Sequence, residues 1–167
     1  MTIEQNKLQY DHILVRFGEL STKGKNKKDF IKRLLTNVKN ALRDYDKLTY
    51  ERTHDRMYIM LHGEDPHEVS EHLQKVFGIS SFSFAIKVAT DIEEMKKTAL
   101  IIAQQSDAET FKIIARRSFK RFPMISDEIN RELAGEILRN TSLRVNVKEP
   151  QLRIQVEVHE FDTYIMT

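Results

Sequence analysis

Apolar and polar positions along the first half of the chain predict a strand, a helix, two strands, a helix and a further strand. Residues 8–18 alternate and end in an apolar run, as a central strand does. Apolar residues then recur at helical spacing from Ile31 to Leu42, and Asn26 is placed to cap that helix. The remaining elements are expected as strands at residues 47–52 and 56–62, a helix that opens at Asp65 and closes at Gly78, and a strand at residues 79–88. This order is the split βαβ, or ferredoxin-like, plan.

The second half of the chain predicts another mixed unit. Thr90 and Glu93 have the spacing of a capping box for a helix that fades near Ser106. Later elements are expected as a strand at residues 110–115, a helix at 126–140 and short strands at 144–147, 151–158 and 163–166. We therefore expect an α/β (α+β) fold with two domains, residues 1–79 and residues 80–167, which abut because no Pro/Gly/Ser linker separates them.

Composition narrows the class of protein. Apolar residues make up 40% of the 167 residues and charged residues 31%, an ordinary globular balance. No apolar run approaches the roughly 20 residues of a membrane span, and the first residues lack a signal peptide's apolar segment, so we expect a cytoplasmic protein without membrane contact. The absence of cysteine excludes disulfides, thiolate metal sites and a cysteine nucleophile in this chain. A net charge of +2 is too small to indicate nucleic-acid binding by itself. Only a local cluster of basic residues could therefore predict such binding.

The first basic cluster lies between the first strand and the first helix. Residues 18–26 occupy the place of a Walker A loop, but five residues separate the two glycines and the segment ends in asparagine, which argues against that type of nucleotide loop. A helix N-terminus surrounded by lysines favours an anion, and a solvated turn is the alternative. The candidate RNA-binding residues of this cluster are Lys23, Lys25, Asn26, Lys27 and Lys28.

The second basic cluster joins a predicted strand to the helix that starts near Ser126. Arginines pair with phosphates, and aromatic or guanidinium planes stack on unpaired bases, so a cluster of both favours a single-stranded RNA end over duplex DNA. The alternative is that Phe119 and Phe122 belong to the core and that the arginines pair with surface carboxylates. The candidate RNA-binding residues are Lys112, Arg116, Arg117, Lys120 and Arg121, with Asn130 and Arg131 one turn into the helix.

Other polar groups indicate neither a metal site nor a catalytic centre. His67 and His72 are five residues apart, which on a helix directs them about 140° from each other. Glu128, Glu132 and Glu136 have Arg131 and Arg139 nearby and are typical of an exposed, salt-bridged helix face. No nucleophile, base and orienting group can be assembled from the sequence, so we expect no metal and no catalytic residue here.

Four segments together resemble the N-terminal part of tRNA 4-thiouridine synthase, the ThiI family: Arg16–Asn26, Arg116–Pro123, Ser126–Glu132 and Val145–Pro150. The resemblance spans essentially the whole chain. It implies a ferredoxin-like domain followed by a THUMP domain, a pair that binds tRNA, with the THUMP domain holding the 3′ CCA end. It assigns Lys23, Lys25 and Asn26 to the signature loop of the first domain, and the THUMP signature to Arg116, Arg117, Lys120, Asn130 and Arg131.

The resemblance also implies a chemistry that this chain is not expected to perform. In the family a catalytic domain with a pyrophosphatase loop and a reactive cysteine replaces the oxygen of a tRNA uridine by sulfur, using ATP and magnesium and a sulfur-donor protein. Some members also serve thiamine biosynthesis, and a homodimer is left open. We expect that domain beyond residue 167, and we expect this chain alone to be non-catalytic and without a cofactor.

Two alternatives remain open from the sequence. A self-contained small enzyme would be supported by a constellation such as His54, Asp55 and Arg56 in a pocket. A protein-interaction adaptor would be favoured if internal acids neutralised the second basic cluster and an apolar patch were exposed instead.

Overall fold

The computed structural model describes residues 10–17, 27–53 and 56–167, which form two compact units. The first unit runs from Tyr10 to Ala85, and the described part of the second runs from Ile86 to Thr167. Among the described residues, no helix is both long and apolar enough to cross a membrane.

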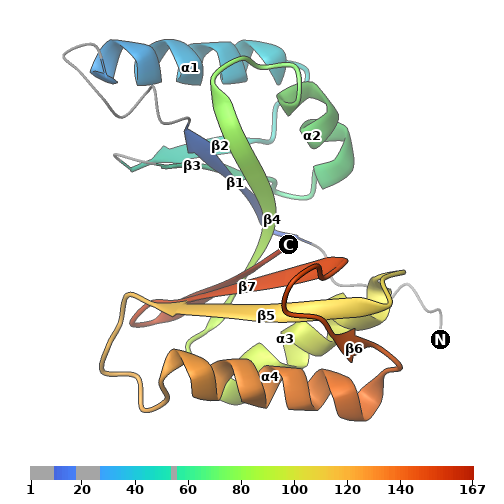
Figure 1. The fold of residues 1–167 in the computed structure, drawn as a ribbon. Helices are drawn as coiled ribbons and strands as arrows, with labels where there is room; N and C mark the ends of the chain where they lie inside the picture. The colour runs from blue at the N-terminus through green and yellow to red at the C-terminus, as the bar shows by residue number, and fades with distance from the viewer. Residues whose placement is uncertain (1–9, 18–26, 54–55) are drawn as a thin grey trace. The chain divides into compact units, whose positions relative to one another are not determined.

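The first unit is a four-stranded antiparallel sheet with two helices (Figure 1). Its strand order is β2-β3-β1-β4, and β1 pairs with both β3 and β4. This order and the alternation of strands and helices confirm the predicted ferredoxin-like plan. The elements are β1 (His12–Phe17), α1 (Lys27–Ala41), β2 (Thr49–Arg52), β3 (Arg56–Met60), α2 (Pro66–Leu73) and β4 (Ile79–Ala89).

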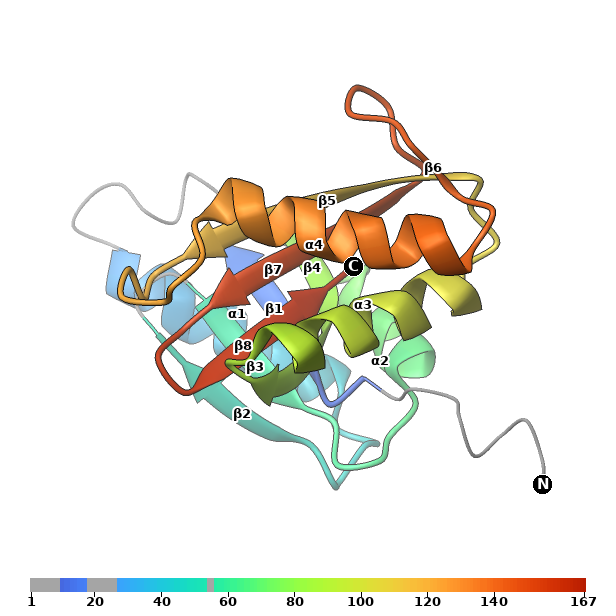
Figure 2. The same ribbon diagram turned by 90° about the horizontal axis from the view of Figure 1, so that it is seen from below.

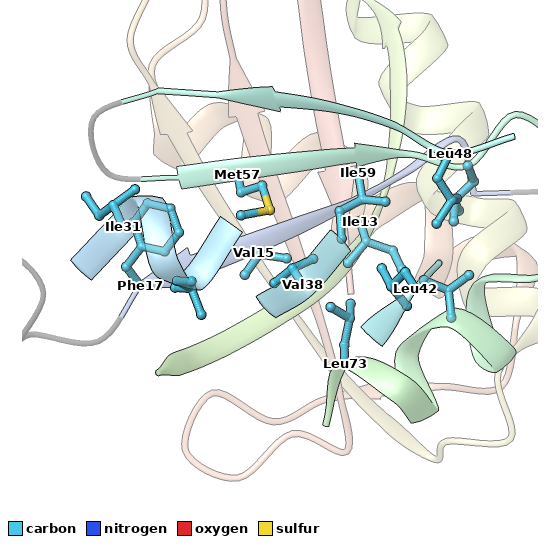
Figure 3. Packing of buried hydrophobic residues seen from close by; sticks show 13 residues of the cluster. Ile13, Val15, Phe17, Ile31, Val38, Leu42, Leu48, Met57, Ile59 and Leu73 are labelled. Atoms are coloured by element: carbon cyan, nitrogen blue, oxygen red, sulfur yellow. The ribbon is translucent and has the colours of Figure 1, made fainter. Parts of the chain in front are cut away.

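The core of the first unit lies between the sheet and α1 (Figure 3). Every second residue of β1 faces this core, and Ile13 and Val15 are fully buried there. From the helix, the i, i+3, i+7 series Ile31, Leu34 and Val38 packs against them. The apolar periodicity that predicted α1 is therefore the face that holds it to the sheet.

Two predicted helix boundaries were wrong, each because a different residue ends or caps the helix. Helix α2 begins as expected, with Asp65 accepting a hydrogen bond from His67 N at 2.8 Å, but it ends at Leu73. Gly78 lies further along, in the left-handed region at φ 101° just before β4, where a Cβ would come within 3.1 Å of the Phe30 ring. It closes the turn into the strand, not the helix.

The cap of the next helix, α3 (Ile92–Gln105), is Asp91 and not Thr90. The Asp91 carboxylate accepts from Glu94 N at 3.2 Å. Thr90 instead donates its hydroxyl proton to His159 O at 2.7 Å, which leaves it unavailable to the helix. A side-chain cap was predicted correctly, but its position is one residue later than predicted, because the Thr90 hydroxyl is used in a tertiary contact.

In the second unit a mixed sheet carries both helices on one face (Figure 2). Strand β5 pairs in parallel with β6 and β7, and β7 pairs with β8 antiparallel. The remaining elements are β5 (Thr110–Arg117), α4 (Ser126–Asn140), β6 (Arg144–Val145), β7 (Leu152–Val158) and β8 (Asp162–Met166). Helix α4 has the predicted bounds, whereas β5 extends two residues beyond the predicted Ala115 and takes in Arg116 and Arg117.

The division between the units falls inside a continuous strand. The compact units separate between Ala85 and Ile86, within β4, whereas the boundary expected from the sequence after residue 79 falls at the start of that strand. A strand shared by two units needs no linker, so composition offers no signal for the boundary.

Candidate nucleic-acid interface

The end of β5 sends neighbouring arginines to opposite faces of the sheet. Along the strand, Phe111, Ile113 and Ala115 are buried on the helix-covered face. Side chains alternate along a strand, so Arg116 lies on the opposite face and Arg117 returns to the face of Ala115. Arg116 is exposed and Arg117 is half-buried.

Arg117 holds the loop that connects β5 to α4. Its Nη1 donates to the carbonyl oxygens of Lys120, Phe122 and Met124, at 3.4, 3.3 and 3.2 Å. Nη1 carries two N–H groups, so the three carbonyl oxygens share them. Arg117 thus shapes the loop from inside.

The beginning of the same loop is anchored to the end of β7. The backbone N–H groups of Ser118 and Phe119 donate to Val158 O at 3.0 and 3.2 Å. The Ser118 hydroxyl lies 2.8 Å from His159 Nδ1 and 3.1 Å from Val158 O. These bonds fix the loop against the carboxyl ends of two parallel strands, so the groups that it presents are preorganised.

Asn130 also acts inside the protein. Its Oδ1 accepts a hydrogen bond from Ala115 N at 2.9 Å, which ties α4 to the last part of β5. The carboxamide oxygen is therefore engaged with the backbone and does not face an approaching ligand as we expected from the sequence. Asn130 and Arg117 together are called the inward group below.

The basic side chains that remain on the surface form the outward group: Arg116, Lys120 and Arg121, all exposed. Among the described residues, no ion pair joins a carboxylate to any of them. Phe119 and Phe122 on the same loop are half-buried, not core residues. The neutralised patch that the adaptor alternative required is thus not found in this part of the chain.

The other candidates of the second cluster lie on two elements, Lys112 on β5 and Arg131 on α4. Lys112 is half-buried on the Arg116 face of β5. Arg131 is exposed on α4, and its Nε donates to Asp127 O at 3.4 Å. The first turn of α4 carries Asp127 and Glu128, and its N-cap residue is Ile125, which has no side-chain acceptor. Because those carboxylates repel an anion, a phosphate would be attracted here by the basic side chains and not by the helix dipole.

The first basic cluster is described only in part. Lys23, Lys25 and Asn26 lie outside the described residues. Lys27 and Lys28 form the start of α1, where Lys27 is half-buried and Lys28 exposed.

The described residues contain no constellation for a metal ion. No group of three His, Asp or Glu side chains there could hold a metal ion. The His67 ring packs on Phe84 at 5.1 Å between centroids, and the His72 ring on Tyr45 at 5.6 Å. His54 and Asp55 lie outside the described residues, while Arg56 begins β3. His67 and His72 therefore serve packing.

Comparison with known domain families defines the class of protein. Residues 12–83 match the ThiI ferredoxin-like domain, and residues 89–167 match the THUMP domain. The chain is thus a THUMP protein in which a ferredoxin-like domain comes first, as the fold of each unit indicates.

Sequence and structure comparisons with individual proteins identify the family of the chain. The chain is 48% identical over 161 residues to a probable tRNA sulfurtransferase of Bacillus pumilus and 46% identical to that of Bacillus subtilis, covering 95% of this chain and 40% of each relative. A solved 4-thiouridine synthetase, crystallised with RNA and ATP, is 31% identical with a TM-score of 0.79, over 95% of this chain and 41% of that one. The chain belongs to the ThiI family, and it spans about two fifths of the length of these relatives.

Proposed function

We propose that this chain binds tRNA and that the outward group holds the unpaired 3′ CCA end. The observation that carries the proposal is a set of exposed basic side chains at the end of β5 and on the loop after it, which Arg117 and Val158 O fix in place. None of these side chains forms an ion pair with a carboxylate among the described residues. Guanidinium groups pair with phosphates, and the half-buried rings of Phe119 and Phe122 can stack with unpaired bases. The 4-thiouridine synthetase structure, which contains RNA, supports the same partner.

Within a longer enzyme this chain would be the substrate-binding part of a tRNA sulfurtransferase. Its relatives carry that name and are longer than this chain. We assign the sulfur transfer and its donor protein to the remainder of such an enzyme, because the 167 residues hold no cysteine to carry sulfur. ATP and magnesium are assigned there too, as the resemblance to the family implies. What the described residues contribute is binding and orientation of the RNA.

A salt series with labelled tRNA tests the proposal. Replacement of Arg116 and Lys120 by alanine removes two cations without touching the Arg117 hydrogen bonds, which run to main-chain oxygens. A matched control replaces Lys97 and Lys148, two exposed lysines outside the loop, with the same change in net charge.

The expected result is about tenfold or more weaker binding by the Arg116/Lys120 variant, with a shallower salt dependence because fewer counterions are released. The control variant should bind nearly as the parent does. Equal affinities for the two variants, or no tRNA binding by the parent, would overturn the proposal.

A further inference from the structure

The turn between β7 and β8 presents an aromatic side chain that belongs to neither basic cluster of the sequence. The turn consists of residues 159–161, and its last residue, Phe161, is 77% exposed. Exposure alone does not define a site, because single apolar residues are common on protein surfaces and Phe77 of the first unit is 90% exposed. The backbone and the neighbours of Phe161 distinguish it from Phe77.

Thr90 holds the backbone of this turn at two points. Its N–H donates to Phe161 O at 3.0 Å, and its hydroxyl donates to His159 O at 2.7 Å. The His159 N–H closes the turn by donating to Asp162 O at 3.0 Å, and Asp162 Oδ2 lies 3.6 Å from Lys87 Nζ. The Phe161 ring therefore stands on a preorganised backbone, and a ligand that stacks on the ring need not order the turn first.

The turn lies at the end of the second sheet that carries the outward group. Strands β5 and β7 are parallel, so the loop after β5 and the turn after β7 begin at the same end, as Figure 1 and Figure 2 both show. The Ser118 hydroxyl lies 2.8 Å from His159 Nδ1, which joins the loop to the turn directly. Phe161 follows this contact by two residues.

The loop and the turn differ in charge. The outward group is positive, whereas the turn carries the exposed carboxylate of Glu160 next to Phe161 in the sequence. A carboxylate repels phosphate, so the turn favours a part of the RNA without one. The 3′-terminal nucleoside is such a part, because no phosphate follows it, and its base has a π-face that an aromatic ring can stack on.

We propose that Phe161 stacks on the base of the 3′-terminal nucleotide, while the outward group holds the phosphates that precede it. This inference rests on the proposed function and adds a contact to the base from a second element of the unit. Every base has a π-face, so Phe161 contributes affinity for an unpaired end and little preference for the identity of the base.

The test uses two RNAs, intact tRNA and a tRNA whose terminal nucleotide lacks its base but keeps its phosphate. Phe161→Ala removes the ring, and Phe161→Trp keeps an aromatic face. Phe77→Ala is the matched control, because it removes an exposed ring of the same type from the first unit. Both rings are exposed, so all three variants should have the melting temperature of the parent.

Phe161→Ala should bind intact tRNA about tenfold more weakly, as expected for the loss of one base–ring stack, and should keep the salt slope of the parent because no phosphate contact is lost. It should bind the abasic tRNA as the parent does. Phe161→Trp and Phe77→Ala should both bind intact tRNA like the parent.

Two results would overturn the inference and indicate a protein partner for the ring instead. One is parent-like binding of intact tRNA by Phe161→Ala, and the other is an equal loss of affinity for the intact and the abasic RNA. In both cases the proposed function would stand, provided that the parent binds tRNA and that the Arg116/Lys120 variant weakens this binding. Failure of the parent to bind tRNA at all would overturn both.

Discussion

The outward group and the inward group come from one short stretch of sequence and have different uses. Arg116 and Arg117 are neighbours of the same type, yet one is exposed and the other donates to three carbonyl oxygens. Asn130 is engaged like Arg117, through the backbone of Ala115. Strand alternation separates the two arginines, so a basic signature contains both the residues that would touch RNA and those that hold them in place.

The largest expected effect on stability is at Asn130. Asn130→Ala leaves the N–H of Ala115, a buried residue, without its acceptor, at a cost of about 1–3 kcal/mol. For a unit of this size the melting temperature should fall by roughly 4–8 °C per kcal/mol. Asn130→Asp keeps an acceptor oxygen and should lose much less. If calorimetry gave the alanine variant the melting temperature of the parent, Asn130 would not belong to the inward group.

A smaller effect is expected at Arg117. Arg117→Lys keeps the charge, but the lysine side chain is one bond shorter and its nitrogen falls short of the Nη1 position from which Arg117 donates to Lys120, Phe122 and Met124, at a cost of about 1 kcal/mol. Arg116→Lys, the matched change on the outward side, should melt like the parent. The Arg117→Lys variant should have a lower melting temperature and a lower tRNA affinity than the parent, whereas the Arg116→Lys variant should keep the melting temperature of the parent. The reverse order of melting temperatures would contradict the division into two groups.

The smallest effect on stability is expected at Lys96, whose ion pairs lie outside the loop between β5 and α4. Lys96 Nζ lies 3.6, 3.7 and 3.9 Å from carboxylate oxygens of Glu93, Glu132 and Glu136, and joins α3 to α4. Lys96→Gln should cost about 0.5 kcal/mol, a difference that shrinks in high salt, and tRNA affinity corrected for stability should not change. A loss of RNA affinity without a loss of stability would place α3 in the binding surface.

Much of the fold could be predicted from local pattern. Helix α4 has the predicted bounds because its buried residues recur at helical spacing, and the acidic face expected there does pair, in part with Lys96 and Arg139. The displaced cap at Thr90 could not be foreseen, because its hydroxyl is used by His159 O, which is far away in sequence. Local rules hold where no distant partner competes for the same atom.

The sequence predicts where a binding surface could lie, but it does not separate the residues that would touch RNA from those that hold the loop. Basic and aromatic residues concentrate in 112–131, and among the described residues no carboxylate forms an ion pair with Arg116, Lys120 or Arg121. That Arg117 and Asn130 act through the backbone depends on the register of β5 and the packing of α4, which no spacing in the sequence specifies. The binding role of each outward residue stays a prediction.

The most direct test of the central claim compares intact tRNA with tRNA trimmed of its 3′ end. If the outward group holds that end, Arg116→Ala/Lys120→Ala should weaken binding of intact tRNA far more than of trimmed tRNA, because the trimmed RNA has already lost the phosphates and bases concerned. The account predicts an intact-to-trimmed affinity ratio that falls close to one in the variant while its melting temperature stays unchanged. A ratio equal to that of the parent protein would contradict it.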